Sequence, residues 1–472
     1  MHTSNVTFHE RVDHALHDGQ LHEALQRATG RFTTLRAEAL ASLQEADAVR
    51  DHARLIRAHT LSRLDHYLAQ FAEQVEAAGG VVHWAPDAAA CNQIVLEIAR
   101  QHQAKRVIKG KSMVSEETEL NRDLLAAGLD VIESDLGERI IQLVGEHPSH
   151  IIVPAIHKTK EEVGRILHAQ LGLPLTTVPE EMTAGVRASL RQDFLNAEIG
   201  VSGVNFGVAA SGTLALVENE GNGRLTTTTP RVHIALMGIE RLVPTLDDLG
   251  VMLQLLARSA TGQKLTVYNN LLTGPRRPGE PDGPDELHVV LVDNGRSRVL
   301  GTEVAEILYC IRCGACLNAC PVYKHMGGHA YGSVYPGPVG AVLTPALGGV
   351  DDWPELPHAS SLCAACREVC PVRIDIPRML LAQRVETQRR GHSPWWLKLG
   401  LPIYSWLVVR PTLFRFAVRV GGVATRLLGG RERAIRWLPP PLSGWTDSRT
   451  FPAFAPKPFS QLMRERRDGT TS

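Results

Sequence analysis

Seven of the eight cysteines in this 472-residue chain fall between positions 310 and 370, at spacings that suit metal binding. CIRCGACLNACP has the spacing C-x2-C-x2-C-x3-C-P, and the later stretch SSLCAACREVCP has C-x2-C-x3-C-P. A disulfide framework would instead scatter its cysteines through a small secreted domain. Zinc sites generally use two ligand pairs with a longer spacer. Three soft thiolates in one tight loop are typical of iron–sulfur clusters, so two clusters are expected.

The last cysteine of each run assigns the ligands. In two-cluster ferredoxins this cysteine, which precedes a proline, binds the other cluster. The first cluster would then take Cys310, Cys313, Cys316 and Cys370. The second would take Cys320, Cys363 and Cys366. The second cluster therefore lacks one thiol, at position 360, where the chain has serine.

Four arrangements could complete the second cluster. Ser360 could bind as an alkoxide, or a histidine, His358 or His329, could bind in its place. The fourth iron could also be held by water, another subunit or substrate. Lastly, the cluster could contain three irons and four sulfides. A non-cysteine ligand or an open iron would change the reduction potential of this cluster.

The region before the cysteines must position them, and its pattern alternates short apolar strands with helical segments. The expected strands include VVHWA, RVIKG, DVIES, HIIVPA, RVHIALMGIERLV and LHVVLVDNG. Such alternation indicates an α/β domain with a largely parallel sheet. Cys91 stands alone on an apolar helical pattern, where a cysteine usually acts as a small buried hydrophobe.

Composition and pattern divide the chain into four expected parts. They are a helical N-terminal segment at 1–79, an α/β domain at 80–300, a mostly helical ferredoxin-type two-cluster domain at 301–390, and a basic, apolar extension at 391–472. The Gly- and Pro-rich stretch between the cysteine runs is expected to be irregular. Pro402 and Pro411 are expected to break the extension into short pieces.

Two polar stretches of the α/β domain are candidate ligand sites. KGKSM places Lys109, Lys111 and Ser112 between a strand and a helix, where ammonium groups and backbone N–H groups can hold an anion such as a carboxylate. A solvated turn with a serine N-cap is the simpler interpretation.

The second stretch is AASGTLALVENEGN. Ser211 lies in a turn that could approach a ligand closely, and Glu218 and Glu220 follow at the end of a strand. A glutamate there could act as a nucleophile of the transferase kind. An ordinary turn and a polar strand end explain the same residues. The sequence contains no Gly-x-Gly-x-x-Gly fingerprint after a strand, so a Rossmann nicotinamide site is unsupported.

Charge and hydropathy limit the partners. The formal net charge is zero, which gives no bulk attraction to nucleic acid or to an anionic membrane. No secretory h-region and no stretch of 18 apolar residues is visible, so we expect a cytoplasmic protein, soluble or peripherally bound. The extension combines tryptophans with arginines, which suits self-packing, an acidic partner face or a membrane interface.

The motifs taken together resemble a known family. CIRCGACLNACPVYKHMGGHAYGSVYPGPVGAVLTP, ASSLCAACREVCPVRI, KGKSMVSEE, GVAASGTLALVENEGNGR and TTTTPRVHIALMGIERLVPTLDDL are similar to stretches of the lactate utilisation protein B family, the YkgF-like iron–sulfur proteins. The resemblance runs from about residue 65 to 390, and the extension is similar to the family's C-terminal part. The family also has three cysteines in its second run.

The resemblance implies a LUD domain, similar to sugar isomerases and CoA transferases, followed by a two-cluster domain with the same ligand sets. It further implies an electron carrier in the oxidation of L-lactate to pyruvate. Its partners would be two sister proteins, one cysteine-rich and one a smaller LUD subunit. The competing hypotheses are a ligand-binding or CoA-transferase-like enzyme with structural or sensory clusters, and an electron carrier for another 2-hydroxy acid such as glycolate.

Overall fold

The computed structural model describes residues 6–440, 442–446 and 449–469. The first residues expected in the N-terminal segment and the last ones of the extension, 1–5 and 470–472, lie outside this description. The chain divides into two compact units, Met1–Arg390 and Gly391–Ser472.

A six-stranded, fully parallel sheet forms the centre of the first unit. Its strands, in spatial order, are β1 (Val81–Ala85), β10 (Glu286–Val292), β7 (Val232–Gly238), β4 (Ile199–Gly203), β2 (Arg106–Lys109) and β3 (Asp130–Glu133). Every residue of β7 is buried, as expected for a strand covered on both faces. The expected α/β fold with a parallel sheet is confirmed.

Apolar faces of helices bury this sheet in three cores. One core joins α5 (Ala88–Gln101) and α7 (Leu120–Ala126) to the sheet, and it contains the fully buried Cys91, as expected. A second core lies under α8 (Leu136–Val144), α9 (Lys160–Leu171) and α10 (Pro179–Asn196). The third is continuous from α4 (Leu64–Ala77) through α12 (Leu246–Ala260) to the cysteine-rich region.

A smaller sheet with the order β8-β5-β6-β9 carries the predicted Gly/Ser turn. Its strands are β5 (Phe206–Val208), β6 (Thr213–Glu218), β8 (Leu242–Val243) and β9 (Tyr268–Leu272). Gly212, with φ +65°, lies so close to α4 that an added Cβ would be 2.6 Å from the Val75 nitrogen. The turn therefore needs glycine for packing.

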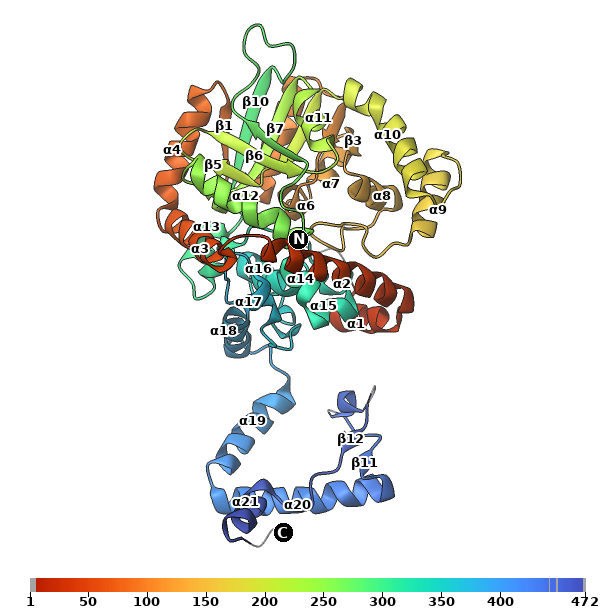
Figure 1. Cartoon of the computed structure of the whole chain (residues 1–472), viewed down its shortest axis with the longest axis vertical. Helices are drawn as coiled ribbons and strands as arrows, with labels where there is room; N and C mark the ends of the chain where they lie inside the picture. Colours follow the sequence, from red (N-terminus) through yellow and green to blue (C-terminus); the bar gives the residue numbers. More distant parts are fainter. Residues whose placement is uncertain (1–5, 441, 447–448, 470–472) are drawn as a thin grey trace. The chain divides into compact units, whose positions relative to one another are not determined.

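Four N-terminal helices complete the first unit: α1 (Phe8–His17), α2 (Gly19–Ala41), α3 (Ala46–Ser62) and α4. Helices α1 and α2 lie beside the cysteine-rich helices, whereas α4 covers the α/β domain (Figure 1). Arg57 of α3 is fully buried and donates to four backbone carbonyls, those of Glu240, Leu242, Leu308 and Tyr309. The N-terminal helices thus connect the α/β and cysteine-rich regions.

The cysteine-rich region is helical, as predicted. It contains η2 (Ala305–Tyr309), α14 (Ala315–Ala319), α15 (Pro321–Met326), η3 (His329–Tyr331), α16 (Gly337–Gly348), η4 (Leu356–His358), α17 (Ala365–Val369) and α18 (Ile376–Arg389). Helix α16 corrects the expectation of an irregular stretch. Ten of its twelve residues are buried, so burial of an apolar segment outweighs its poor helix propensity.

The stretch HIIVPA is not a strand, contrary to prediction. It forms bends and turns in which the backbone N–H groups of Ile152 and Val153 donate to Nδ1 of the buried His150. The other ring nitrogen of His150 lies 3.2 Å from Oδ1 of Asn318 in α14. This segment therefore fixes the α/β domain to the cysteine-rich region instead of joining the sheet.

The second unit contains α19 (Trp395–Val408), α20 (Pro411–Gly429), the paired strands β11 (Ala434–Ile435) and β12 (Phe451–Pro452), and α21 (Phe459–Arg467). Pro402 lies inside α19 without ending it, and Pro411 begins α20, so the predicted breaks are wrong at the first proline. Among the described residues, no helix has the length and apolar character required to cross a membrane.

Candidate iron–sulfur centre and adjoining pocket

Four thiols line one small internal cavity. They belong to Cys310, Cys313, Cys316 and Cys370, and apolar side chains including Ile151, Val339 and Ile374 close the cavity around them. Cys370 arrives from the second run, as the ligand-swap rule requires. This is the set expected for the first cluster.

The remaining three thiols form a second group near the surface. The charges of Cys320 and Cys363 both act on Cys366, whose pKa is raised to about 12, chiefly by burial. Cys363 is exposed to solvent, whereas Cys320 and Cys366 are buried. A coordinating metal ion deprotonates such thiols outright, so burial is no obstacle to ligation.

Backbone amides point at the sulfur atoms in both groups. The N–H groups of Arg312, Ile374 and Tyr323 donate to Sγ of Cys310, Cys370 and Cys320 at 3.4, 3.3 and 3.5 Å. Hydrogen bonds to sulfur are one determinant of the potential of a cluster. The free thiols, their two groupings and these amides fit two clusters.

The two cysteine loops have the same backbone conformation, fifty positions apart. Arg312 and Gly314 have φ of +60° and +73°, and Leu362 and Ala364, their counterparts, have φ of +56° and +67°. In the first loop the amide of Arg312 donates to Cys310 Sγ. In the second, the amide of Leu362 donates to Oγ of Ser360 at 3.1 Å. The Ser360 hydroxyl thus occupies the position that Cys310 Sγ has in the first loop.

The two histidines have other surroundings. His358 is exposed, and Arg384 and Glu355 supply the charges that act on it. A ring nitrogen of His329 lies 2.7 Å from the carbonyl of His147, and its ring packs on His157. None of these contacts of His358 and His329 is with a cysteine.

One residue near the thiols, Tyr331, is not among the candidates predicted from the sequence. Tyr331 is fully buried, and its hydroxyl has no hydrogen-bond partner among the described residues. Burial raises its pKa, and so do the charges of Cys320, Cys316 and Cys366, which lie in its neighbourhood. A tyrosine in a Gly-rich stretch gives no sequence signal for this placement.

Arginines surround the first thiol group. Arg50 of α3 donates to the carbonyl of Cys370 at 2.9 Å, and Arg241 donates to that of Cys310 at 2.9 Å. Arg312 pairs with Glu240 at 3.3 Å, and its Nη1 is buried without a partner among the described residues. These cations favour added negative charge at the first cluster.

A pocket of about 290 Å³ adjoins the first thiol group at the carboxyl ends of β2, β4 and β7, with Arg312 and Ile151 lining both cavities. This end of a parallel sheet is where α/β folds bind ligands. The predicted Lys111, Ser112 and Glu218 all line it. Arg241 and Glu220 line it too.

Lys111 and Ser112, which both line this pocket, make different hydrogen bonds within the protein. Lys111 Nζ donates to the carbonyl of Ile152 at 2.6 Å, and its charge also acts on the carboxyls of Glu138 and Glu220. Ser112 is the N-cap of α6 (Met113–Glu117), with Oγ accepting from the N–H of Ser115. The simpler interpretation of Ser112 as a cap is therefore confirmed, although it also lines the pocket.

Two glutamates of the pocket, Glu218 and Glu220, differ in their hydrogen bonds and in the pKa of the carboxyl group. The Glu218 carboxylate accepts from the N–H groups of Gly223 and Arg224 at 2.6 and 2.7 Å and from the Asn270 amide, so it is fixed. Glu220 lies at the mouth, where loss of hydration and the Asp135 carboxylate raise its pKa to about 7. Glu220 can therefore exchange a proton near neutral pH.

Two predicted ligand residues lie elsewhere. Lys109 is fully buried, and its ammonium contacts Glu133 at 2.9 Å and Glu116 at 3.2 Å, so it is neutralised within the fold and has no free charge for an anion. Ser211 hydrogen-bonds to Thr213 in the turn that packs on α4. Neither residue lines the pocket.

Comparison with known proteins gives three family matches along the chain. Residues 68–292 match the LUD domain, residues 306–374 the 4Fe-4S dicluster domain, and residues 384–468 the C-terminal region of lactate utilisation protein B. "Lactate utilization protein B" of Geobacillus sp. (strain WCH70) is 46% identical over 99% of both chains. The chain belongs to the lactate utilisation protein B family.

Two further relatives agree with this membership. "Lactate utilization protein B" of Anoxybacillus flavithermus is 45% identical over 97% of this chain and 98% of its own. The "uncharacterized electron transport protein YkgF" of Escherichia coli K12 is 44% identical over 95% of this chain and 94% of its own. As a family member, the chain is an iron–sulfur electron-transport protein with two 4Fe-4S clusters, which rejects the three-iron alternative.

Proposed function

We propose that this protein is the electron-transfer subunit of a cytoplasmic complex that oxidises L-lactate to pyruvate. Family membership supports the substrate, and two neighbouring thiol groups support the role. Oxidation of lactate to pyruvate releases two electrons and two protons. Two one-electron clusters in one chain hold both electrons before a partner removes them.

The sister lactate-utilisation proteins, one cysteine-rich and one a smaller LUD subunit, are the proposed partners. The test is anaerobic addition of L-lactate to the cluster-loaded chain, alone and mixed with both sisters, followed by EPR. We expect cluster reduction only in the mixture. If glycolate reduces the mixture and L-lactate does not, the substrate assignment is wrong. If neither acid does, the electron-transfer role in hydroxy-acid oxidation is wrong.

We also propose the ligand sets given by the swap rule, with Ser360 as the fourth ligand of the second cluster. The supporting observation is the equivalent placement of Ser360 Oγ and Cys310 Sγ in two loops of the same conformation. An oxygen is a harder ligand than sulfur and suits iron–sulfur chemistry less well, which would make this cluster the more labile one.

Substitution of Ser360 tests that ligand. We expect Ser360→Cys to change the EPR signal of one cluster only and to slow its loss in air, and Ser360→Ala to lower iron content toward that of one cluster. His358→Ala, two residues away, should change neither. An effect of His358→Ala with no effect of either Ser360 variant would assign the ligand to the histidine instead.

We further propose that the pocket beside the first thiol group binds a small carboxylate of the 2-hydroxy or 2-oxo acid class. Lys111, Arg241 and Nη1 of Arg312, which has no hydrogen-bond partner in the described part of the chain, supply positive charge. Glu220 supplies a group that can accept or donate a hydroxyl proton.

Calorimetric titration of the cluster-loaded chain with pyruvate measures this binding. We expect Lys111→Ala to weaken it about tenfold, the loss of one charge-assisted contact. Lys105→Ala removes an equal charge at an exposed position outside the pocket and should leave it unchanged. Equal affinities in all three proteins would contradict the pocket assignment.

A further inference from the structure

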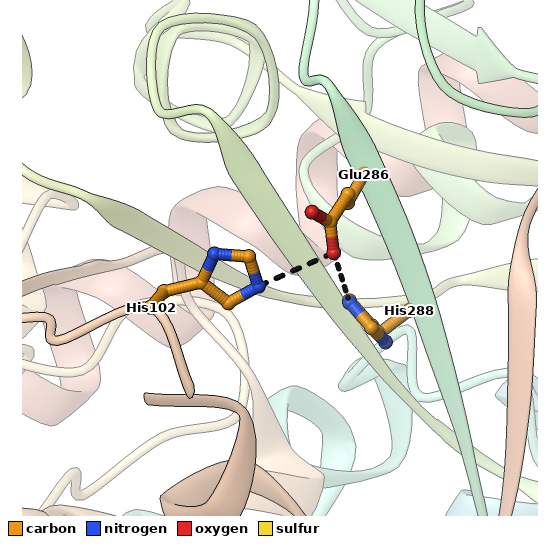
Figure 2. A group of neighbouring side chains, drawn as sticks. All are labelled: His102, Glu286 and His288. Carbon is orange, nitrogen blue, oxygen red and sulfur yellow. Dashed lines mark hydrogen bonds and ion pairs between the residues drawn. The ribbon is translucent and has the colours of Figure 1, made fainter. Parts of the chain in front are cut away.

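A second cluster of potential ligands lies at the opposite end of the parallel sheet, away from the cysteines and the pocket. Glu286 and His288 stand two positions apart at the start of β10, so their side chains project from the same face. Helix α5 contacts β10, and His102 is its C-cap residue. The three side chains meet there (Figure 2).

Two of the distances among these groups match the spacing of ligands around one metal ion, and the Glu286–His288 contact is also a long hydrogen bond. Oε2 of Glu286 lies 3.2 Å from Nε2 of His102 and 3.3 Å from Nε2 of His288, the two dashed contacts of Figure 2. A tetrahedral zinc site with ligands at about 2.0–2.1 Å has edges of about 3.3–3.4 Å. Charge-assisted hydrogen bonds are shorter, about 2.7–2.9 Å.

A fourth residue orients one of the imidazoles. Nε2 of His83, from the neighbouring strand β1, lies 3.0 Å from Nδ1 of His288. If His288 donates from Nδ1 to His83, the lone pair of its Nε2 points toward Glu286. Such a second partner, holding the ring and its tautomer, is a regular feature of histidine metal ligands.

In each of the other two groups of potential ligands among the described residues, a lysine ammonium already contacts the carboxylates. Lys158 Nζ lies 2.5 Å from Oε1 of Glu146 in the group Glu146, His157 and His329. Lys109 contacts two carboxylates of the group Glu116, Glu133 and Glu138.

The site is also reachable from solvent. The side chains of His102 and Glu286 are 28% and 49% exposed, whereas that of His288 is 9% exposed. An ion can therefore enter from the Glu286 side, and a water can complete its coordination.

We propose that His102, Glu286 and His288 bind one zinc ion, with water in the remaining position and His83 as the orienting residue. Two imidazoles and one carboxylate are donors that zinc accepts readily. The ion would join the C-terminal end of α5 to the first residues of β10. This site is independent of the proposed electron transfer.

The test uses the full chain with both iron–sulfur clusters loaded. After anaerobic dialysis against zinc chloride and removal of free metal, zinc per chain is counted by mass spectrometry and its ligands are identified by X-ray absorption. We expect one zinc with nitrogen and oxygen ligands at about 2.0 Å, and unchanged iron. Sulfur ligands at about 2.3 Å would mean that zinc has entered the cysteine sites, and would overturn the proposal.

Two variants and one control locate the ion. His102→Ala and Glu286→Gln should each lose the bound zinc while iron content stays unchanged, which also shows that they fold. His52→Ala removes an exposed histidine of α3 and should retain one zinc. Retention of zinc by both site variants, or absence of zinc from the wild type, would overturn the proposal.

Discussion

At the scale of single residues, Ser360 shows what the spacing of cysteines can predict about cluster ligands and what it cannot. Spacing alone predicts the seven cysteine ligands, their division into two sets and the vacancy at position 360. It could not distinguish serine from histidine as the substitute. The proposal of Ser360 rests on backbone conformation, because the residues around Leu362 have positive φ angles and the Leu362 amide donates to the Ser360 hydroxyl.

Tyr331 allows a sharper test of the protein environment of the clusters. Its buried phenol has no hydrogen-bond partner within the described ranges, so it can donate to a cluster sulfur, which stabilises the reduced state. Tyr331→Phe should therefore leave iron content unchanged and lower the potential of one cluster by roughly 20–60 mV, equivalent to about 0.5–1.4 kcal/mol for one electron.

Redox titration followed by EPR measures this shift. Tyr323→Phe is the matched control, because its buried hydroxyl donates to the Ser149 carbonyl at 2.7 Å. The interpretation fails if the two variants shift the potential equally, or if Tyr331→Phe has no effect.

Glu220 makes ligand affinity depend on pH. Its pKa of about 7 means that the carboxyl is mostly protonated at pH 6 and mostly ionised at pH 8. Ionisation adds a negative charge beside the bound carboxylate. We expect the Kd for pyruvate to rise roughly three- to tenfold between these pH values.

The measurement is calorimetric titration at several pH values. Glu220→Gln, which stays neutral, should bind with nearly constant affinity over this range. A wild-type affinity that increases with pH would show that Glu220 does not face the ligand.

At the scale of elements, the sequence predicts a strand or helix correctly where the spacing of its apolar residues matches the face that is buried. The strand VVHWA and the helix that contains Cys91 formed as predicted. HIIVPA and α16 did not, because their conformations depend on distant partners. His150 binds Asn318, more than 160 positions away, and α16 is buried on nearly all sides.

Helix α3 carries a fully buried charge, that of Arg57. The Arg57 guanidinium donates to four carbonyls from both sides of the boundary between the α/β and cysteine-rich regions. Arg57→Met leaves these carbonyls without that donor. We expect a decrease of at least about 3 kcal/mol in the free energy of unfolding.

Anaerobic urea denaturation of the cluster-loaded protein checks this value. Arg63→Met, which alters an exposed arginine six residues further on, should change the free energy of unfolding by less than about 0.5 kcal/mol. Equal destabilisation by both substitutions would show that the buried hydrogen bonds are not the cause.

At the scale of the whole molecule, the two compact units have different surfaces. In the second unit, α19 has no buried residue, and Trp395 and Leu427 are 75% and 78% exposed. Arg415 and Arg419 of α20 and Arg410, its N-cap residue, add positive charge. A partner face that is acidic and apolar would match this surface.

Truncation after Arg390 separates the roles of the two units. Every cysteine lies in the first unit, so the truncated chain should retain the iron content and EPR signals of the full chain. It should lose the capture of purified sister proteins that the full chain shows. Unchanged capture would assign the partner surface to the first unit.

The contacts of the N-terminal helices bear on the order of chain folding and cluster insertion during synthesis. Thr33 reaches the Asn318 carbonyl, and Arg50 reaches that of Cys370, across 285 and 320 positions. These helices leave the ribosome long before the cysteine-rich region that they contact. Until that region emerges, the parts of α2 and α3 that do not pack on α12 have no native cover. We therefore expect iron and sulfide to reach the first thiol group before α2 and α3 pack against it.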